Sequence, residues 1–309
     1  RYIEHPIRTR KILVSNRSLI AAMLAVGCML ITAGVFSLKT NGLDFRYNGM
    51  ARSMLTASFD TRDERCGFIF RSLHPNAQVC QLNGIPVKMR NGILLWGNSH
   101  AGMWVDLLSK LADNHGIPFY LNARNCRATI DHSFCNENVQ SQILKFIETK
   151  RINKVILASS WYGGYNIPDD KFERDLENVV SKLSLLGVEI YLVIDTPSDT
   201  SFDPRRQYLQ NKNHPTFGSI AISQYEETTH GRELNLFKNI TRKFTNVRII
   251  DPISSFCFDG KRCYGGRVNA WYRDSGHITL TGAQEARNLF MPVFNGLQEM
   301  HKEQEAGLN

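Results

Sequence analysis

Several common patterns are missing from this 309-residue sequence, and their absence excludes several classes of protein. It has no internal repeat or low-complexity tract, and 42% of its residues are hydrophobic, so a disordered chain does not fit. A single run is long, apolar and uncharged, which excludes a multi-pass membrane protein for this stretch of chain. The seven cysteines show no C-x-x-C spacing and no tight cluster with histidines, so we expect no metal site.

The net positive charge is small beyond the N-terminal segment. The net charge is +8, and half of it comes from residues 1–17. The remainder is spread over nearly three hundred residues, which is too dilute to indicate a nucleic-acid surface, and we expect no nucleic-acid partner. The charged residues of the N-terminal segment are Arg1, Arg8, Arg10, Lys11 and Arg17 against Glu4.

Residues 18–38 form the apolar run SLIAAMLAVGCMLITAGVFSL. A helix of this length spans roughly 30 Å, the thickness of the hydrocarbon core of a bilayer. A buried core helix seldom runs so long without a polar face, and the apolar region of a cleaved signal peptide is usually shorter. We therefore expect a transmembrane helix at 18–38. The basic residues 1–17 place the N-terminus in the cytoplasm and everything beyond residue 40 outside it.

Six cysteines follow this run, and Cys28 lies within it. Disulfides persist outside the cytoplasm, so these six are candidates for pairing. Short loops lose the least entropy on closure, which makes pairing between neighbours the first expectation. Buried free thiols are the alternative. The neighbouring couples are Cys66–Cys80, Cys126–Cys135 and Cys257–Cys263.

From residue 92 onward, apolar runs alternate with amphipathic stretches, which is typical of a parallel sheet covered by helices on both faces. We expect a three-layer α/β/α domain at 91–309, preceded by a linker or extension at 39–90. The expected strands are 92–98, 118–123, 154–161, 189–196 and 247–252, which form a five-stranded parallel sheet. Helical spacing occurs at 103–116, 139–150, 170–187, 223–244 and 281–300.

Ser99 follows the first expected strand in the block Gly97-Asn98-Ser99-His100, and a helix begins directly after it. In open α/β sheets, ligands bind outside the carboxyl ends of the strands. A serine at such a strand-to-helix turn has an exposed hydroxyl, and the helix N-terminus offers N–H groups where an oxyanion would form. The alternative is that Ser99 serves only as the helix N-cap.

Asp274 and His277 supply what a serine nucleophile needs, which is a base and a group that orients the base. They lie three residues apart just before the last expected helix. We expect His277 to act as general base on Ser99 and Asp274 to hold the imidazole in one tautomer. The D-x-x-H pattern is weak alone, but the order Ser99, Asp274, His277 in this architecture is more specific.

These blocks resemble those of the SGNH hydrolase superfamily, whose domain is flavodoxin-like. The resemblance rests on Gly97-Asn98-Ser99-His100, on Asp274-x-x-His277 followed by Ile-Thr-x-x-Gly-Ala, and on the five-strand frame. The N-terminal RYIEHPIR is similar to the end of a membrane-bound acyltransferase-3 domain. Proteins that join both parts O-acetylate bacterial surface sugars. We therefore expect this chain to be the C-terminal part of such a fusion.

The resemblance implies a function. Ser99 would be the nucleophile, His277 the base and Asp274 its partner. The reaction would be O-acyl transfer, in particular O-acetyl transfer, to a surface carbohydrate such as O-antigen or lipopolysaccharide, through an acyl-serine. The protein would lie in the bacterial inner membrane with a periplasmic catalytic domain. Acetyl-CoA would be the ultimate donor, handled by the acyltransferase-3 domain, with no cofactor bound to the present segment. The alternatives are a carbohydrate esterase or deacetylase and a non-catalytic glycan-binding module.

Two departures from the superfamily pattern affect the site. Gly-Asn-Ser stands where Gly-Asp-Ser is common, and neither the usual oxyanion glycine nor the Gly-x-Asn-Asp block is evident. We therefore expect the oxyanion hole to use the Ser99 backbone N–H together with a donor from Ser160 or the backbone of Trp161.

Other conspicuous residues have structural or functional interpretations. His100 either contacts the substrate, braces the turn or packs beside Trp104. His230 is expected at the surface, and Arg124 and Arg127 either meet an anionic glycan or are simply exposed. Five aromatic residues near the expected strand ends either pack in the domain or hold a sugar ring: Trp161, Tyr162, Tyr165, Trp271 and Tyr272.

Overall fold

The structure is a computed structural model that describes residues 4–9, 11–12, 15–40, 42–47, 49–61, 66–86, 92–129, 135–162 and 169–295. Residues 1–3, where the acyltransferase-3-like segment begins, and Tyr165 lie outside the described residues.

A six-stranded sheet forms the centre of the domain, with the strand order β1-β3-β2-β4-β5-β7. The five strands expected from the apolar runs all form and pair in parallel. The sixth strand, β1, pairs antiparallel with β3, so the sheet is mixed rather than wholly parallel. The strands are β1 (Val79–Gln81), β2 (Gly92–Gly97), β3 (Phe119–Asn122), β4 (Ile152–Ala158), β5 (Glu189–Val193) and β7 (Val247–Ile250).

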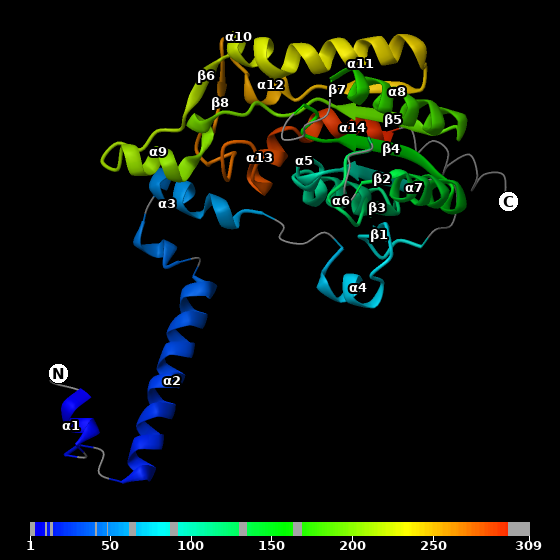
Figure 1. Ribbon diagram of the computed structural model, residues 1–309. Coiled ribbons are helices and arrows are strands. Elements are labelled where there is room, and N and C mark those ends of the chain that lie inside the picture. Colours follow the sequence, from blue (N-terminus) through cyan, green and yellow to red (C-terminus); the bar gives the residue numbers. More distant parts are fainter. Residues whose placement is uncertain are drawn as a thin grey trace.

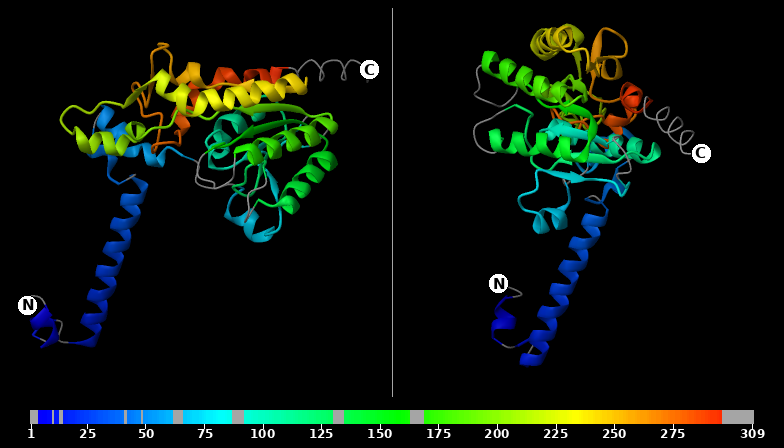
Figure 2. Two further views of the ribbon diagram at one scale, coloured as in Figure 1. Left: turned by 45° about the horizontal axis from the view of Figure 1, so that its top comes forward. Right: turned by 90° about the vertical axis from the view of Figure 1, so that its right-hand side faces the viewer.

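Helices cover both faces of this sheet and complete the expected three layers (Figures 1 and 2). Ile93 and Leu95 of β2 share one core with α6, α13 and α14. The alternate side chains, Leu94 and Trp96, share a second core with α7, α8 and α11. Every residue of β2 is buried, because a central parallel strand has helices on both sides. These helices are α6 (Val105–Asn114), α7 (Glu137–Lys150), α8 (Asp169–Leu185), α11 (Gly231–Lys243), α13 (Leu280–Glu285) and α14 (Arg287–Asn295).

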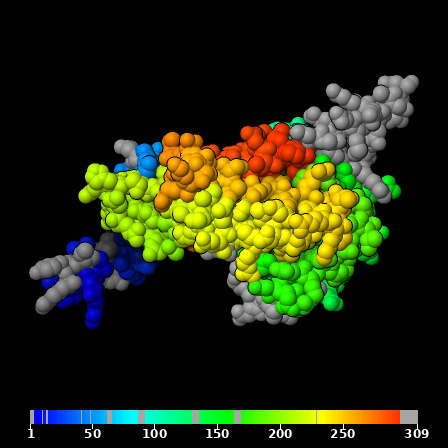
Figure 3. All heavy atoms as spheres, turned by 90° about the horizontal axis from the view of Figure 1, so that it is seen from above, coloured from blue at the N-terminus to red at the C-terminus, as the bar shows by residue number. Residues whose placement is uncertain are grey.

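Seen from above in Figure 3, the yellow α11 lies beside the green α8, and Lys243 of α11 pairs with Glu177 of α8 at 2.8 Å. A small two-stranded sheet lies beyond them at the end of the domain (Figure 1). The elements of this region are α9 (Pro204–Gln210), β6 (Ser219–Ala221), α10 (Ile222–Tyr225), α12 (Ile253–Phe256) and β8 (Arg262–Tyr264).

The expected membrane helix forms as α2 (Asn16–Lys39), after the short α1 (Glu4–Arg8). Ser15 caps α2 by accepting a hydrogen bond from the Ser18 N–H at 3.1 Å. No residue of α2 is buried, and the helix stands apart from the domain in Figures 1 and 2. Among the described residues it is the one helix long and apolar enough to cross a membrane.

The segment 39–90, expected as a linker or extension, is built into the domain. It supplies α3 (Gly49–Thr56), α4 (Phe68–Leu73) and the edge strand β1. Asp60 accepts the backbone N–H groups of Leu280 and Thr281 at 2.9 and 3.0 Å, at the start of α13. The sequence does not reveal β1, because a three-residue strand between polar loops is too short to show alternation.

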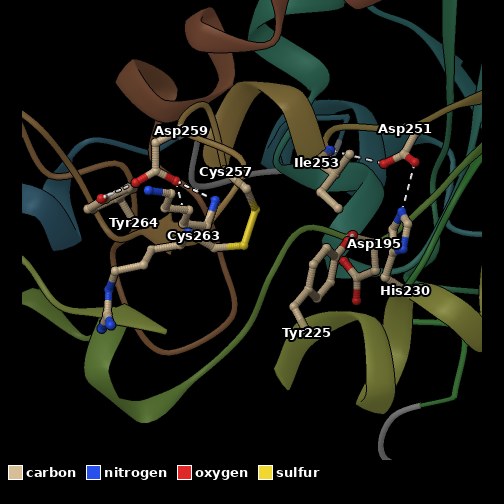
Figure 4. Close-up of a disulfide and its surroundings, with 11 residues drawn as sticks. Asp195, Tyr225, His230, Asp251, Ile253, Cys257, Asp259, Cys263 and Tyr264 are labelled. Atoms are coloured by element: carbon tan, nitrogen blue, oxygen red, sulfur yellow. Dashed lines mark hydrogen bonds and ion pairs between the residues drawn. A yellow bond between two sulfur atoms is a disulfide. The ribbon is translucent and has the colours of Figure 1, made fainter. Parts of the chain in front are cut away.

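Three disulfides join the neighbouring cysteine couples. The Cα atoms lie 5.7 Å apart in Cys66–Cys80, 5.3 Å in Cys126–Cys135 and 3.9 Å in Cys257–Cys263. Cys66–Cys80 ties the start of α4 to β1, and Cys257–Cys263 ties the end of α12 to β8 (Figure 4). Cys28 is free and exposed on α2.

Two expected helices are interrupted. The stretch 223–244 contains a π-helical turn, Glu226–His230, between α10 and α11. Gly231 donates its N–H to the Glu226 carbonyl five residues back, and a Cβ at Gly231 would lie 2.6 Å from that oxygen. The stretch 281–300 breaks at Ala286 into α13 and α14 over its described part.

We predict that Gly97→Ala lowers the free energy of unfolding by at least about 2 kcal/mol, because overpacking at this site cannot relax easily. The new Cβ would lie 1.6 Å from the Ala158 carbonyl oxygen and 2.9 Å from the Cβ of Ala101. Gly102→Ala is the matched control, because a Cβ there meets nothing within 4 Å. We expect the control to change stability by no more than about 1 kcal/mol. Urea unfolding followed by circular dichroism measures both, and equal losses would contradict the prediction.

Candidate active site

Ser99 is the first residue of the short helix α5 (Ser99–Gly102), which follows β2 directly. The N-cap of this helix is Asn98, whose side-chain oxygen accepts the His100 N–H at 3.0 Å. The same oxygen accepts the Ser160 N–H at 3.2 Å, at the end of β4. Since Asn98 performs the capping, the Ser99 hydroxyl is not required for it and is available for another partner.

That partner is His277. The Ser99 Oγ lies 2.9 Å from Nε2 of His277, 178 residues further along the chain. The Nδ1 atom of the same ring lies 3.0 and 3.1 Å from the two carboxylate oxygens of Asp274. A carboxylate can only accept, so Nδ1–H donates to Asp274 and the Nε2 lone pair faces the serine hydroxyl. The structure thus brings together the three residues that the sequence indicates.

Asp274 is held as a carboxylate by its surroundings. One of its oxygens accepts the backbone N–H groups of Gly276 and His277 at 2.9 and 2.8 Å. Burial alone would raise the pKa of Asp274, but the hydrogen bonds from the His277 side chain and these two N–H groups outweigh it and hold the pKa well below its ordinary value. Asp274 therefore stays charged and can stabilise the imidazolium that forms when His277 takes a proton.

A pocket of about 750 Å³ lies next to Ser99. It is open enough for a substrate to approach the hydroxyl, and its lining mixes cationic and apolar side chains. The lining includes Arg71, Arg124, Arg273, Phe70, Met103 and Leu121. The arrangement of hydroxyl, imidazole and carboxylate beside this pocket is suited to nucleophilic acyl transfer.

Of the two expected second oxyanion donors, the Ser160 backbone N–H has another acceptor, whereas the backbone N–H of Trp161 stays a prediction. The Ser160 N–H is bound to Asn98, as described above. Trp161 is 1% exposed, and its indole N–H donates to the Val193 carbonyl at 2.8 Å. Neither residue lines the pocket. Among the described residues, the backbone N–H of Ser99 has no acceptor, and its role in an oxyanion hole stays a prediction.

The remaining conspicuous residues are mostly structural. Trp161, Trp271 and Tyr272 are buried, so they pack in the domain as one of the two interpretations has it. His230 is buried, contrary to expectation, and lies 2.7 Å from Asp251, 21 residues away (Figure 4). Arg127 is also buried and donates to the Trp161 carbonyl at 2.6 Å. Both polar groups are accommodated by partners distant in sequence, which local spacing does not show.

His100 has a partner that the sequence analysis missed. Its Nδ1 lies 2.6 Å from Oδ1 of Asp195, which follows the carboxyl end of β5. Asp195 lies near the carboxyl end of the expected strand 189–196, EIYLVIDT, where ligands bind in such sheets, but the local sequence does not indicate its pairing with His100.

The sequence of this chain matches, over residues 64–292, the family described as "SGNH domain (fused to AT3 domains)". The match covers most of the chain, including Ser99, Asp274 and His277. The chain belongs to this family.

Several solved structures are similar to parts of this chain at low sequence identity. The periplasmic domain of a lipopolysaccharide acetyltransferase from Salmonella ser. Paratyphi A is 16% identical, with a TM-score of 0.52 over 67% of this chain and 84% of that one. A GDSL-like lipase from Bacteroides thetaiotaomicron is 14% identical, with a TM-score of 0.40 over 70% and 93% of the two chains. An acetyl-xylooligosaccharide esterase variant from Geobacillus is 13% identical, with a TM-score of 0.41 over 66% and 94%. No curated protein matches the chain in sequence.

We predict that Asp274→Asn slows acylation of Ser99 by an activated acetyl ester by roughly 10³- to 10⁴-fold, because the amide holds the wrong imidazole tautomer and carries no charge. Asp170→Asn is the control, since that side chain is 68% exposed on α8. Stopped-flow release of the ester's leaving group measures the rate. A loss of less than tenfold in a folded variant would remove Asp274 from this role.

Proposed function

We propose that this SGNH domain is an O-acyltransferase that transfers an acetyl group to a hydroxyl of a bacterial surface carbohydrate, such as O-antigen or lipopolysaccharide. The observation that carries the proposal is the continuous set of hydrogen bonds from Ser99 through His277 to Asp274 at the edge of an open pocket. Membership of a family fused to AT3 domains supports transfer over simple hydrolysis. The fold similarity to a lipopolysaccharide acetyltransferase domain supports the choice of acceptor.

In the first half-reaction, Nε2 of His277 takes the proton of the Ser99 hydroxyl as Oγ attacks the acyl carbonyl of the donor. Asp274 stabilises the imidazolium that results. The imidazolium then protonates the leaving group as the bond between acyl carbon and donor breaks. The product is an acyl ester on Ser99, with His277 neutral again.

In the second half-reaction, the acceptor hydroxyl occupies the place of the departed group. His277 removes its proton, the oxygen attacks the acyl-serine, and the proton returns to Ser99 Oγ as the ester bond to Ser99 breaks. Water competes for the same position, so transfer depends on an acceptor that is held in place. The pocket beside Ser99 offers the room for such an acceptor.

The donor would come from the fused AT3 domain, with acetyl-CoA as the ultimate source on the cytoplasmic side. This chain would carry no cofactor of its own and would receive the acyl group at Ser99. Its partners would be the AT3 membrane domain and the carbohydrate acceptor.

The domain would lie in the periplasm, anchored to the inner membrane by α2. Two features support this location. The basic residues precede α2 rather than follow it, which favours a cytoplasmic N-terminus. All six cysteines beyond α2 are in disulfides, which persist in an oxidising compartment.

We predict that the membrane-anchored chain in detergent, given an activated acetyl ester and an acceptor oligosaccharide, produces acetylated sugar. Ser99→Ala should lower this product more than about 10³-fold, because no acyl-enzyme can form. Ser141→Ala, on the exposed side of α7, is the control and should retain activity. Mass spectrometry of the oligosaccharide measures the product. Release of free acetate without acetylated sugar would indicate an esterase and contradict transfer.

The location has a separate test. A reporter enzyme that is active only outside the cytoplasm should be active when joined after residue 60 and silent when joined after residue 12, because α2 separates the two points. The colour of colonies on an indicator substrate measures the reporter activity of both fusions. The reverse pattern would place the domain in the cytoplasm.

A further inference from the structure

A second histidine–carboxylate pair lies against the catalytic one. His100 Nδ1 and Asp195 Oδ1 are 2.6 Å apart, and the two side chains are 12% and 7% exposed. His100 is the residue after the nucleophile on α5. Its ring centre lies 4.8 Å from that of His277, with the planes inclined by 51°. His100 therefore packs against the ring of His277, whose two nitrogen atoms face Ser99 and Asp274.

Asp195 is fixed from several directions. Its Oδ1 accepts the Thr196 N–H at 2.9 Å in addition to the bond from His100. Its own N–H donates to Glu233 Oε2 of α11 at 2.8 Å, and its carbonyl accepts the Tyr225 hydroxyl at 2.5 Å (Figure 4 shows Tyr225 beside Asp195). The carboxylate of Asp195 therefore has a defined position and direction toward His100.

The carboxyl group next to Asp195 belongs to Glu233. Glu233 is fully buried, and burial, together with the nearby Asp195, raises its pKa well above the ordinary value. Its surroundings therefore favour the neutral form of Glu233, and its Oε2 accepts the Asp195 N–H.

The charges around His100 favour its cationic form. Burial lowers the pKa of His100, but the charge and hydrogen bond of Asp195 and the more distant charge of Asp274 outweigh burial and the opposing charge of Arg273, so the net shift is upward. Besides these groups, His277 faces the ring from the loop before α13.

We propose that His100 and Asp195 form a positioning pair for the catalytic base: Asp195 fixes the His100 ring against the His277 ring, where His100 favours the unprotonated form of His277. The role assigned to His277 rests on the proposed function, whereas the effect of His100 on the proton equilibrium of His277 does not. A neutral His277 can accept the Ser99 proton at lower pH, and the imidazolium formed in each half-reaction passes its proton on more readily. Asp274 thus stabilises the protonated form of the His277 ring, whereas His100 favours its unprotonated form.

His100→Asn tests the charge separately from the hydrogen bond, because an asparagine amide can still donate to Asp195 but is neutral. Asp195→Asn removes the carboxylate that holds His100 charged. In each variant we expect the pKa of His277 to rise by about one unit, the effect of losing a nearby like charge. His115→Asn is the control, because His115 lies at the end of α6 and bonds the Leu111 carbonyl. It should leave His277 unchanged.

The primary measurement is the titration of the His277 imidazole signals by nuclear magnetic resonance, on the membrane-anchored chain in detergent with Ser99→Ala in the background. It needs no turnover, so it stands if the proposed function fails. The second measurement is the pH profile of kcat/KM for an activated acetyl ester in the presence of Ser99. The acid limb should move up by about one unit, with a loss of about tenfold below the midpoint.

The outcomes are distinct. A raised midpoint for His277 in both variants, with the double variant no further shifted than either single one, supports the positioning pair. An unchanged midpoint in folded His100→Asn overturns it, even where esterase activity falls, because a purely structural role would lower activity at every pH alike. A shift in the titration without turnover on any acyl ester supports the pair and contradicts the proposed function.

Discussion

The active site depends on one hydrogen-bonding atom, the side-chain oxygen of Asn98. It accepts one N–H from the first turn of α5 and one from the segment after β4, and so joins the ends of two neighbouring strands. Gly97 lets the chain pass against the Ala158 carbonyl just before it. With this turn fixed, Ser99 faces His277 and His100 faces Asp195. The departure from Gly-Asp-Ser to Gly-Asn-Ser is therefore compatible with the site, because the bonds needed here are bonds to an oxygen, which an amide provides.

The surroundings of two carboxyl groups at the site shift their pKa values in opposite directions. Asp274 has a depressed pKa because it receives hydrogen bonds from an imidazole and two backbone N–H groups. Glu233 has a raised pKa because it is buried beside another acid. The surroundings of Asp274 thus favour its charged form, whereas those of Glu233 favour its neutral form. Asp274 accepts a hydrogen bond from the His277 ring, and Glu233 accepts the N–H that orients Asp195.

Local sequence patterns predict the parts of this protein whose signal lies within a few residues. The five parallel strands, α2 and the D-x-x-H block are of this kind, and Ser99 follows from its place after a strand. The structure also pairs the cysteines as their short separations predict. Asp195, β1 and the Asp251 partner of His230 are not predictable this way, because each is defined by a contact between distant segments. Ser160 was assigned from its proximity to a strand end, whereas its backbone N–H is bound to the side chain of Asn98.

Asp60 and Thr61 bind the C-terminal part of the domain around Asp274 and His277. Asp60 binds the first N–H groups of α13, and Thr61 accepts a bond of 2.6 Å from Arg273, the residue before Asp274. Ser53 of α3 also binds the Ala270 N–H at 2.8 Å. The loop that carries the base and its carboxylate is therefore braced by chain that precedes residue 64, where the family match begins. The segment that braces this loop reaches back to Ser53 of α3, so a fragment that began at residue 64 would lose all of these contacts.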